Sequence, residues 1–308
     1  MIDLRQQVSA YVTMRRSLGF KLRGHDRLLT DFVDYLDHTG ASTVTSQLAL
    51  AWATKPTNVQ PLWWKKRLSV MCGFSRYLHT LDPSVEVPAP DLLAYRYQRP
   101  IPYLFSETEI TGLIDAAGTL SPPLRAATHQ ALFGLLAVTG MRIGEAIRLD
   151  CDDLDLEAGL IRIRQTKFNK SRQLPLHPTT IAALKEYTRQ RDWLGGKPRV
   201  PSFFVSTRGT RLIDTCVRLV FAQLIARIGL KPRSGSGRPH IHSLRHTFAV
   251  ATLREWYRAG EDVTSKLPLL SAYLGHVDPV STYWYLQAAP ELLALAAERI
   301  GHPKGGFR

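Results

Sequence analysis

The residues whose types and spacing could do chemistry lie between His240 and Leu286. His242 is followed three residues later by Arg245, and His276 and Tyr285 come further along the chain. Positions three apart share one face of a helix, so His242 and Arg245 can line one pocket. Histidines and an arginine can hold an anion while a phenol attacks it. This combination suits the transfer of a phosphate diester.

Tyr285 is the predicted nucleophile. An unperturbed phenol has a pKa of about 10, so it needs nearby cations and a proton acceptor, either a histidine or the phosphate itself. Tyr283 is the rival, two residues away, and on a helix the two would point to different faces. The distance of Tyr285 from His276 favours Tyr285. A tyrosine ester preserves the energy of the broken phosphodiester, so strands can be rejoined without ATP.

Arg142 follows Thr139-Gly140 at a predicted helix start. Its guanidinium and the helix N-terminus both favour phosphate oxygens. Together with Arg245 it would stabilise the charge of a pentavalent phosphorane without a metal ion. Glu145, one turn later, either orients a catalytic arginine or histidine or only caps its helix.

Lys167 lies at the tip of a predicted hairpin. Such a lysine is either solvated surface or, if it reaches into a cleft, the acid that protonates a leaving alkoxide. Lys170 and Arg172 lie close by and leave that assignment open.

No metal or other cofactor is expected. His242 and His246 have a spacing that metal ligands use, but the sequence has neither an HExxH motif nor a closely spaced cysteine pair. Its three cysteines, at positions 72, 151 and 216, are scattered. They are interpreted as buried or free thiols in a reducing cytosol, so we expect a cytoplasmic protein.

The bulk composition favours two domains and a polyanionic partner. The 308 residues exceed one typical domain, and 44% hydrophobic residues are enough for a real core. Lys and Arg number 40 against 26 Asp and Glu, giving a net charge of +14. Nucleic acid is the first candidate partner and an anionic membrane surface the second. A membrane span would need about 18 consecutive apolar residues, and the sequence has no such run.

The first domain is predicted to be helical, with helices in 4–38 (broken near Gly19 and Gly24), 45–54 and 59–81. Trp63 and Trp64 either pack in its core or stack on bases. The basic run Lys65, Lys66 and Arg67 is either a solvated face or a DNA-phosphate contact. Proline-rich chain follows from residue 82. We expect a helical domain at 1–95, a linker at 96–104 and a second domain at 105–308.

The second domain is predicted to combine helices with a small sheet. Ser106 and Glu109 form a capping box, and an apolar helix covers 124–139. Short strands are expected at 153–156, 160–165 and 172–176, followed by helices from 179 and 214. Arg233 and Arg238 lie in a Gly- and Ser-containing loop suited to following phosphates. The fold class is therefore mainly α with a small antiparallel sheet (α+β).

In this order the motifs resemble the tyrosine recombinase (phage integrase) family over residues 105 to about 290. The matching stretches are Thr139-Gly140-Met141-Arg142-Ile143-Gly144-Glu145, residues 167–172 before Leu174-Pro175-Leu176, His242-Ser243-Leu244-Arg245-His246-Thr247-Phe248, and Leu274-Gly275-His276 with Tyr285. Each motif alone is weak, and their common order makes the signal strong.

The resemblance implies a role for each candidate. Arg142 and Arg245 would clamp the scissile phosphate, and Lys167 would protonate the 5′-hydroxyl leaving group. His242 would assist proton transfer, and His276 would hydrogen-bond the phosphate. The tyrosine nine residues after His276 would form a 3′-phosphotyrosyl bond.

The resemblance also implies partners. The substrate would be double-stranded DNA with inverted-repeat core sites, held by a helical core-site binding (SAM-like) domain. Four protomers, or a hetero-assembly with related recombinases, would act on two duplexes through a Holliday junction. The chain looks like the simple two-domain members, including those of bacterial mobile elements, which carry out integration or transposition. Its segment 254–270 is longer than usual, and a tail helix at 288–300 would dock on a neighbouring protomer or cap its own domain.

Two other functions stay open from the sequence. One is an inactive architectural DNA-binding protein of the same fold, against which the complete set of six catalytic candidates argues. The other is a type IB topoisomerase-like enzyme that relaxes DNA, against which the separate helical domain and the tail argue.

Overall fold

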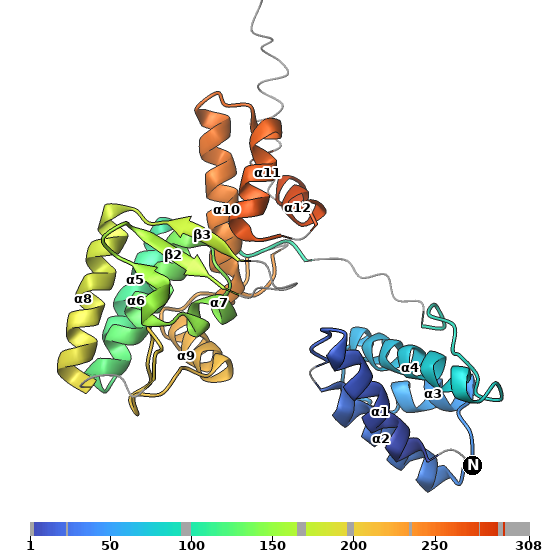
Figure 1. The fold of residues 1–308 in the computed structure, drawn as a ribbon. Helices are drawn as coiled ribbons and strands as arrows, with labels where there is room; N and C mark the ends of the chain where they lie inside the picture. The colour runs from blue at the N-terminus through green and yellow to red at the C-terminus, as the bar shows by residue number, and fades with distance from the viewer. Residues whose placement is uncertain are drawn as a thin grey trace, which may run out of the picture. The chain divides into compact units, whose positions relative to one another are not determined.

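The computed structural model describes residues 3–22, 24–93, 100–164, 171–195, 200–233, 236–276, 278–288 and 292. The chain divides into two compact units, residues 1–99 and 100–308. Helices dominate both, and the second also contains a three-stranded antiparallel sheet (Figure 1). The predicted fold class is confirmed. Within the described residues, no helix is long and apolar enough to cross a membrane.

The first unit consists of four helices: α1 (Leu4–Ser17), α2 (His25–Thr39), α3 (Ser46–Thr54) and α4 (Pro61–Leu81). α2 and α4 each contact the other three helices, so these two helices form the centre of the unit. Asp3 caps α1 by accepting from the backbone N–H of Arg5 and Gln6. Trp52 and Phe32 meet edge to face in the buried core, with ring centroids 5.2 Å apart.

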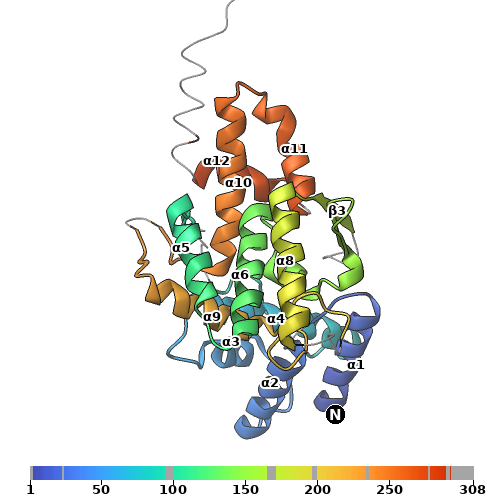
Figure 2. The same ribbon diagram turned by 90° about the vertical axis from the view of Figure 1, so that its left-hand side faces the viewer.

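The second unit is built around α6 (Pro123–Thr139). This apolar helix lies between α5 (Glu107–Gly118) and α8 (Pro178–Gly195), with α10 (Ile241–Arg258) packed against it (Figure 2). The predicted capping box at the start of α5 is present. The helices α7 (Ile143–Arg148) and α9 (Asp214–Arg227) and the 3₁₀ turn η1 (Cys151–Asp153) complete the core around it.

The sheet has the order β1 (Leu154–Asp155), β2 (Leu160–Ile163) and β3 (Arg172–Pro175). Ile161 pairs with Leu174, and Ile163 pairs with Arg172. Ile161 and Ile163 are buried while Arg162 between them is exposed, as alternation along a strand requires. The sheet therefore places Arg172, at the start of β3, near the C-terminal end of α11 (Val263–Leu274).

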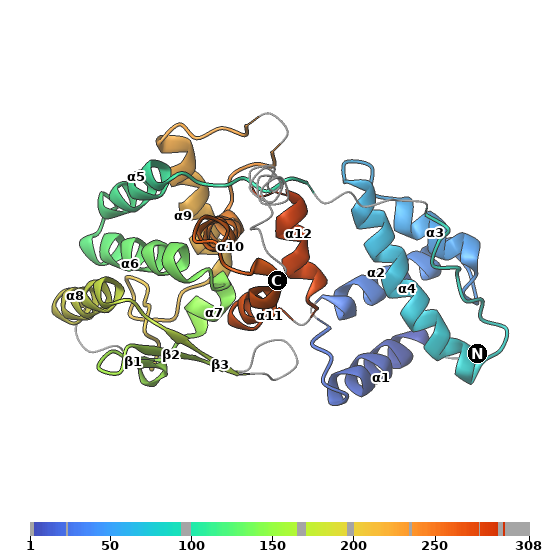
Figure 3. The same cartoon turned by 90° about the horizontal axis from the view of Figure 1, so that it is seen from above.

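α10, α11 (Val263–Leu274) and α12 (Val280–Ala288) form a helical subassembly with its own apolar cluster (Figure 3). Leu253, Leu267 and Leu270 are buried in it together with Tyr285 and Leu292. The segment 254–270 supplies the last turn of α10, the connection and the first two turns of α11.

The chain enters the second unit along the loop that precedes α10. The backbone of Ile101 bridges to Ser236, and the Phe105 N–H donates to the Thr247 hydroxyl on α10 (2.8 Å). Arg233 donates to the carbonyl oxygen of Leu104 (2.8 Å), so this entry segment is tied both to the loop before α10 and to α10 itself.

Gly140 ends α6 in the left-handed region, with φ +60°. A Cβ added there would lie 2.5 Å from Cδ1 of Phe248 on α10. Glycine is needed both for the turn and for the close approach of α10.

We expect Gly140→Ala to lower the free energy of unfolding by about 1–3 kcal/mol, because it adds backbone strain and a clash. Urea denaturation followed by tryptophan fluorescence measures it. Gly209→Ala is the matched control for φ alone, since Gly209 also has a positive φ (+71°) but open space around its Cα. Equal losses in the two variants would contradict the packing argument.

Candidate active site

Three arginines converge on the C-terminal end of α11. The carbonyl oxygens of residues 273–275 accept, in order, from Arg172 Nε (2.7 Å), Arg245 Nη2 (2.8 Å) and Arg142 Nη2 (2.9 Å). The last carbonyls of a helix lack intrahelical partners and carry its negative end, so they attract cations. The helix end thus brings together side chains from β3, α10 and the start of α7.

Glu145 lies under this cluster and orients two of the arginines. Its carboxylate accepts from Arg142 Nη1 (2.9 Å) and from the Arg142 backbone N–H (3.0 Å). It also accepts from Arg172 Nη1 (3.2 Å) and Nη2 (2.9 Å). Both interpretations of Glu145 therefore hold, because the same carboxylate caps α7 and fixes guanidinium groups.

The electrostatics of Glu145 reflect this pairing. Burial raises the pKa of its carboxyl, but the hydrogen bonds and charges of Arg172 and Arg142 outweigh burial and leave the pKa below its ordinary value. The carboxylate is therefore ionised at neutral pH. The Arg142 side chain remains 37% exposed, so part of its guanidinium is open to a ligand.

Arg245 is the most buried cation of the cluster, with 2% of its surface exposed. Its Nη1 donates to the carbonyl oxygen of Gly140 (2.9 Å), so a second helix end supports it. Burial, and after it the positive charge of Arg142, lower the pKa of its guanidinium to about 10. The group stays charged at neutral pH, and it is a cation held where water solvates it poorly.

Tyr285 on α12 lies against two histidines. Its hydroxyl oxygen is 3.2 Å from Nδ1 of His246, and its ring stacks on that of His276 with centroids 6.1 Å apart. His276 in turn has Nδ1 2.7 Å from the hydroxyl of Thr282, which is 1% exposed. Tyr285 is 1% exposed whereas Tyr283 is 46% exposed. Of the two tyrosines, Tyr285 is the one inside the cluster.

His242 lies one turn before His246 on α10, and their rings meet edge to face with centroids 4.6 Å apart. The structure therefore brings together Arg142, Glu145, His242, Arg245, His276 and Tyr285. Lys167 and the neighbouring Lys170 lie outside the described residues, so the predicted acid has no described position.

The expected DNA-contact residues fall into two groups. Lys66 is exposed, Lys65 is half-buried and Arg238 is exposed. Arg67 is only 7% exposed, because its guanidinium lies 3.7 Å from the centroid of the Trp52 ring and donates to Asp31 and to the Trp52 carbonyl. Its place in the core corrects the expectation that it contacts DNA.

Arg233 is also held by the protein. Besides the Leu104 carbonyl, it donates to Glu109 (2.7 Å), and its guanidinium lies 4.7 Å from the centroid of the Tyr103 ring. These contacts anchor the entry segment of the second unit, so Arg238 is the better candidate in this loop for a phosphate.

Three residues of the cluster carried no assigned role in the sequence. Arg172 appeared only as a neighbour of Lys167, His246 only as a possible metal ligand, and Thr282 not at all. The basic residue two positions before Leu174-Pro175 was the available signal for Arg172, but its partners lie far along the chain, at Glu145 and Tyr273.

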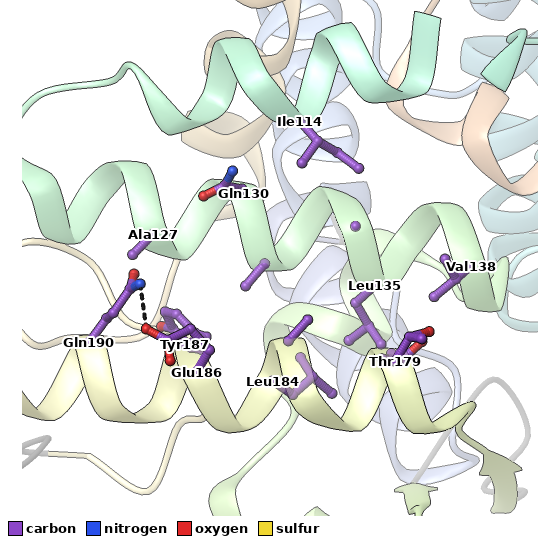
Figure 4. Close-up of a pocket in the computed structure, with 14 residues that line it drawn as sticks. Ile114, Ala127, Gln130, Leu135, Val138, Thr179, Leu184, Glu186, Tyr187 and Gln190 are labelled. Atoms are coloured by element: carbon purple, nitrogen blue, oxygen red, sulfur yellow. Dashed lines mark hydrogen bonds between the residues drawn. The ribbon is translucent and has the colours of Figure 1, made fainter. Parts of the chain in front are cut away.

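A groove of about 370 Å³ lies elsewhere, between α5, α6 and α8 (Figure 4). Its lining is mostly apolar, with Ile114, Leu135 and Leu184 on its walls and the Glu186–Gln190 hydrogen bond at one end. In the described part of the chain, no expected catalytic residue lines it, and its chemistry does not suit an anion. Among all the residues that the structure describes, no three His, Cys, Asp or Glu side chains lie close enough together to bind a metal ion.

The sequence profile of the phage integrase family matches residues 104–291, more than half of the 308 residues. The chain belongs to the phage integrase family. A putative integrase/recombinase of Sinorhizobium fredii, y4rB, is 42% identical over 97% of this chain and 98% of its own length. The tyrosine recombinase XerC of Alcanivorax borkumensis is 29% identical over 79% of this chain and 74% of its own. The resemblance drawn from the motifs is confirmed, and the protein is a tyrosine-type site-specific recombinase.

Solved structures of the same kind share the fold. The XerH site-specific recombinase, bound to palindromic difH substrate after cleavage, has a TM-score of 0.68 at 18% identity, covering 91% of this chain and 80% of that one. The Tn1549 transposon integrase, bound to transposon right-end DNA, has a TM-score of 0.67 at 16% identity, covering 98% of this chain and 100% of that one. At such identities the likeness shows the fold alone.

We expect Glu145→Gln to lower the free energy of unfolding by about 3 kcal/mol at pH 7, because Arg172 and Arg142 lose a buried ionic partner. The folded pKa of Glu145 lies below the unfolded value of about 4.3. Its stabilisation is therefore complete above about pH 4.3 and is lost as the pH falls through the folded pKa. Urea unfolding at a series of pH values measures the difference between variant and wild type.

Glu157→Gln is the control, because the Glu157 side chain is 88% exposed and pairs with Lys185 on the surface. It should change stability little at any pH. A Glu145→Gln difference that stayed constant down to acid pH would contradict the assignment of the stabilisation to the ionised carboxylate.

Proposed function

We propose that this recombinase cleaves and rejoins DNA strands through a 3′-phosphotyrosyl intermediate at Tyr285 and exchanges them through a Holliday junction, without ATP or metal. The observation that carries the proposal is the position of Tyr285, buried against His276 and His246 beside the Arg245 cluster. A nucleophile held beside a group of anion-binding cations is the arrangement that attack on an anion needs.

The charge of the cluster supports phosphoryl transfer. Arg142, Arg172 and Arg245 bring three positive charges, and Glu145 brings a single negative one, which leaves two positive charges among these four side chains. A phosphodiester carries one negative charge, and its phosphorane with an attacking phenolate carries two. The cluster therefore matches the transition state better than the ground state, and that difference accelerates the reaction.

The proposed roles follow from the geometry and the family. Arg245 and the exposed side of Arg142 bind the nonbridging oxygens, and His276, oriented by Thr282, donates to one of them. His242 assists proton transfer, and Lys167 protonates the leaving 5′-oxygen. Rejoining is the reverse, in which the 5′-hydroxyl attacks phosphorus and expels the tyrosine.

The proposed substrate is double-stranded DNA with inverted-repeat core sites. The solved relatives include XerH bound to palindromic difH substrate and a lambda integrase tetramer bound to a Holliday junction. For this chain we propose four protomers on two duplexes, or a mixed assembly with related recombinases, acting on a mobile element in the bacterial cytosol. Lys65, Lys66 and Arg238 are proposed phosphate contacts, with residues 1–95 binding the core site, 96–104 linking and 105–308 carrying the chemistry.

Tyr285→Phe should abolish the covalent protein–DNA adduct, because it removes the attacking oxygen. A pool of nicked suicide duplexes with randomised core sequence is incubated with wild type in EDTA, and the trapped DNA is sequenced to supply a defined substrate. Denaturing gels then measure adduct formation by each variant.

Tyr283→Phe is the matched control and should form the adduct at the wild-type rate, since Tyr283 faces solvent. Adduct formation by Tyr285→Phe but not by Tyr283→Phe would assign the nucleophile to the wrong tyrosine. A requirement for magnesium would contradict the metal-free mechanism.

Truncation after Leu292, which removes residues 293–308, tests the proposal that the tail docks on a neighbouring protomer. Leu292 is kept because it is 1% exposed in the cluster of α10, α11 and α12. We expect adduct formation on a single site to persist and assembly of four protomers to weaken by about tenfold or more, or about 1.4 kcal/mol. Sedimentation of the complexes with DNA measures assembly, and an unchanged assembly would contradict tail docking.

A further inference from the structure

We propose that His246 is the proton acceptor for Tyr285 during strand cleavage, an inference that rests on the proposed function. Its Nδ1 takes the phenolic proton as the tyrosine oxygen attacks phosphorus, and returns it when the strand is rejoined. His246 is thereby a catalytic residue in addition to the six proposed from the family pattern.

The contact between the two groups is direct and enclosed. Nδ1 of His246 lies 3.2 Å from the Tyr285 hydroxyl oxygen, and the ring centroids are 5.5 Å apart. His246 is 5% exposed and Tyr285 is 1% exposed. A general base must be within hydrogen-bond reach of the proton it abstracts, and this histidine is.

The side chains around Tyr285 are suited to stabilising the anion, which leaves His246 to accept the proton. Guanidinium groups have no lone pair to accept a proton, so Arg142 and Arg245 can stabilise a phenolate but cannot form it. His276 presents its ring face to the Tyr285 ring, and its Nδ1 bonds to Thr282. The His242 ring contacts the ring of His246 edge to face, and His246 is the histidine whose Nδ1 lies within hydrogen-bonding distance of the Tyr285 hydroxyl.

The position of His246 along α10 explains why it can act beside the phosphate. It follows Arg245 directly, so one turn of helix delivers both a phosphate ligand and a base. The ring of Trp284 also packs on His246, with centroids 5.3 Å apart. Ring contacts from His242, Trp284 and Tyr285 fix the orientation of the imidazole and so hold Nδ1 toward the Tyr285 hydroxyl.

The proton and electron changes balance in each direction. In cleavage the Tyr285 oxygen forms a bond to phosphorus, the bond from phosphorus to the 5′-oxygen breaks, and the phenolic proton moves to His246 Nδ1. The departing 5′-oxygen takes its proton from a separate acid, proposed above as Lys167. In rejoining, the 5′-oxygen bonds to phosphorus and its proton returns to Lys167, while the bond from phosphorus to the tyrosine oxygen breaks and His246 gives its proton to that oxygen.

The test compares one reaction that must remove the phenolic proton of Tyr285 with a second reaction that involves no phenolic proton. The first is adduct formation on the defined suicide duplex. The second joins a strand bearing a 5′-hydroxyl to a DNA 3′-phosphate esterified with p-nitrophenol. That reaction uses the arginine cluster but bypasses Tyr285, and nitrophenolate leaves without protonation.

Two variants of His246 separate holding from proton transfer. Asn in His246→Asn can keep a hydrogen bond near the Nδ1 position but is not basic, and Phe in His246→Phe keeps only the ring. We expect both to slow adduct formation by about 100-fold, within the usual range for a general base. Both should join the nitrophenyl substrate at the wild-type rate, as should Tyr285→Phe. His177→Asn, at an exposed histidine, is the control for substitution itself.

Each outcome decides the proposal. Adduct formation by His246→Asn at the wild-type rate would show that a hydrogen bond suffices and would overturn proton transfer. Loss of the nitrophenyl reaction in both His246 variants would assign His246 to folding of the arginine cluster and would overturn it as well. Absence of an adduct in wild type, or its presence in Tyr285→Phe, would instead overturn the proposed function, and this inference with it.

Discussion

The attraction between one helix end and three arginines is the interaction on which the second unit depends. Arg142, Arg172 and Arg245 would repel each other, yet the carbonyls of residues 273–275 and the carboxylate of Glu145 hold them together. α11 can offer these carbonyls because it ends at Gly275 with φ +69°, and a Cβ there would lie 2.7 Å from Arg172 Nη1. The glycine before His276 is therefore part of the anion site, although it contributes no functional group.

Local sequence patterns predicted most of the fold, because the start, end and buried face of most helices and strands depend on residues within or next to each element. Apolar spacing located α6 and the helices of the first unit, turn residues separated the three strands, and the capping box marked the start of α5. The basic run at 65–67 shows where such patterns fail. Successive residues on a helix point about 100° apart. Lys66 therefore faces solvent while Arg67 turns inward onto Trp52, and a run of like residues does not form one surface.

Only the residues of the candidate site that lie in short motifs could be predicted from the sequence. The order of Arg142, His242, Arg245, His276 and Tyr285 sufficed for the family, which the sequence comparisons confirm. The supporting contacts were not readable, because they join residues distant in sequence. Arg172 reaches Tyr273, which is 101 residues away, and His246 reaches Tyr285, which is 39 residues away. Such pairs are set by packing of α10, α11 and α12, and no local periodicity encodes that packing.

The hydrogen bond from the Phe105 N–H to Thr247 has a mechanical consequence. Thr247 is the residue after His246, and Ile101 and Leu104 are tied to the loop that leads into the same helix. Tension applied to the chain where it enters the second unit is therefore delivered to α10 itself, one residue from His246 and two from Arg245. A load transmitted along the chain from the first unit would therefore strain α10 beside the residues proposed for catalysis.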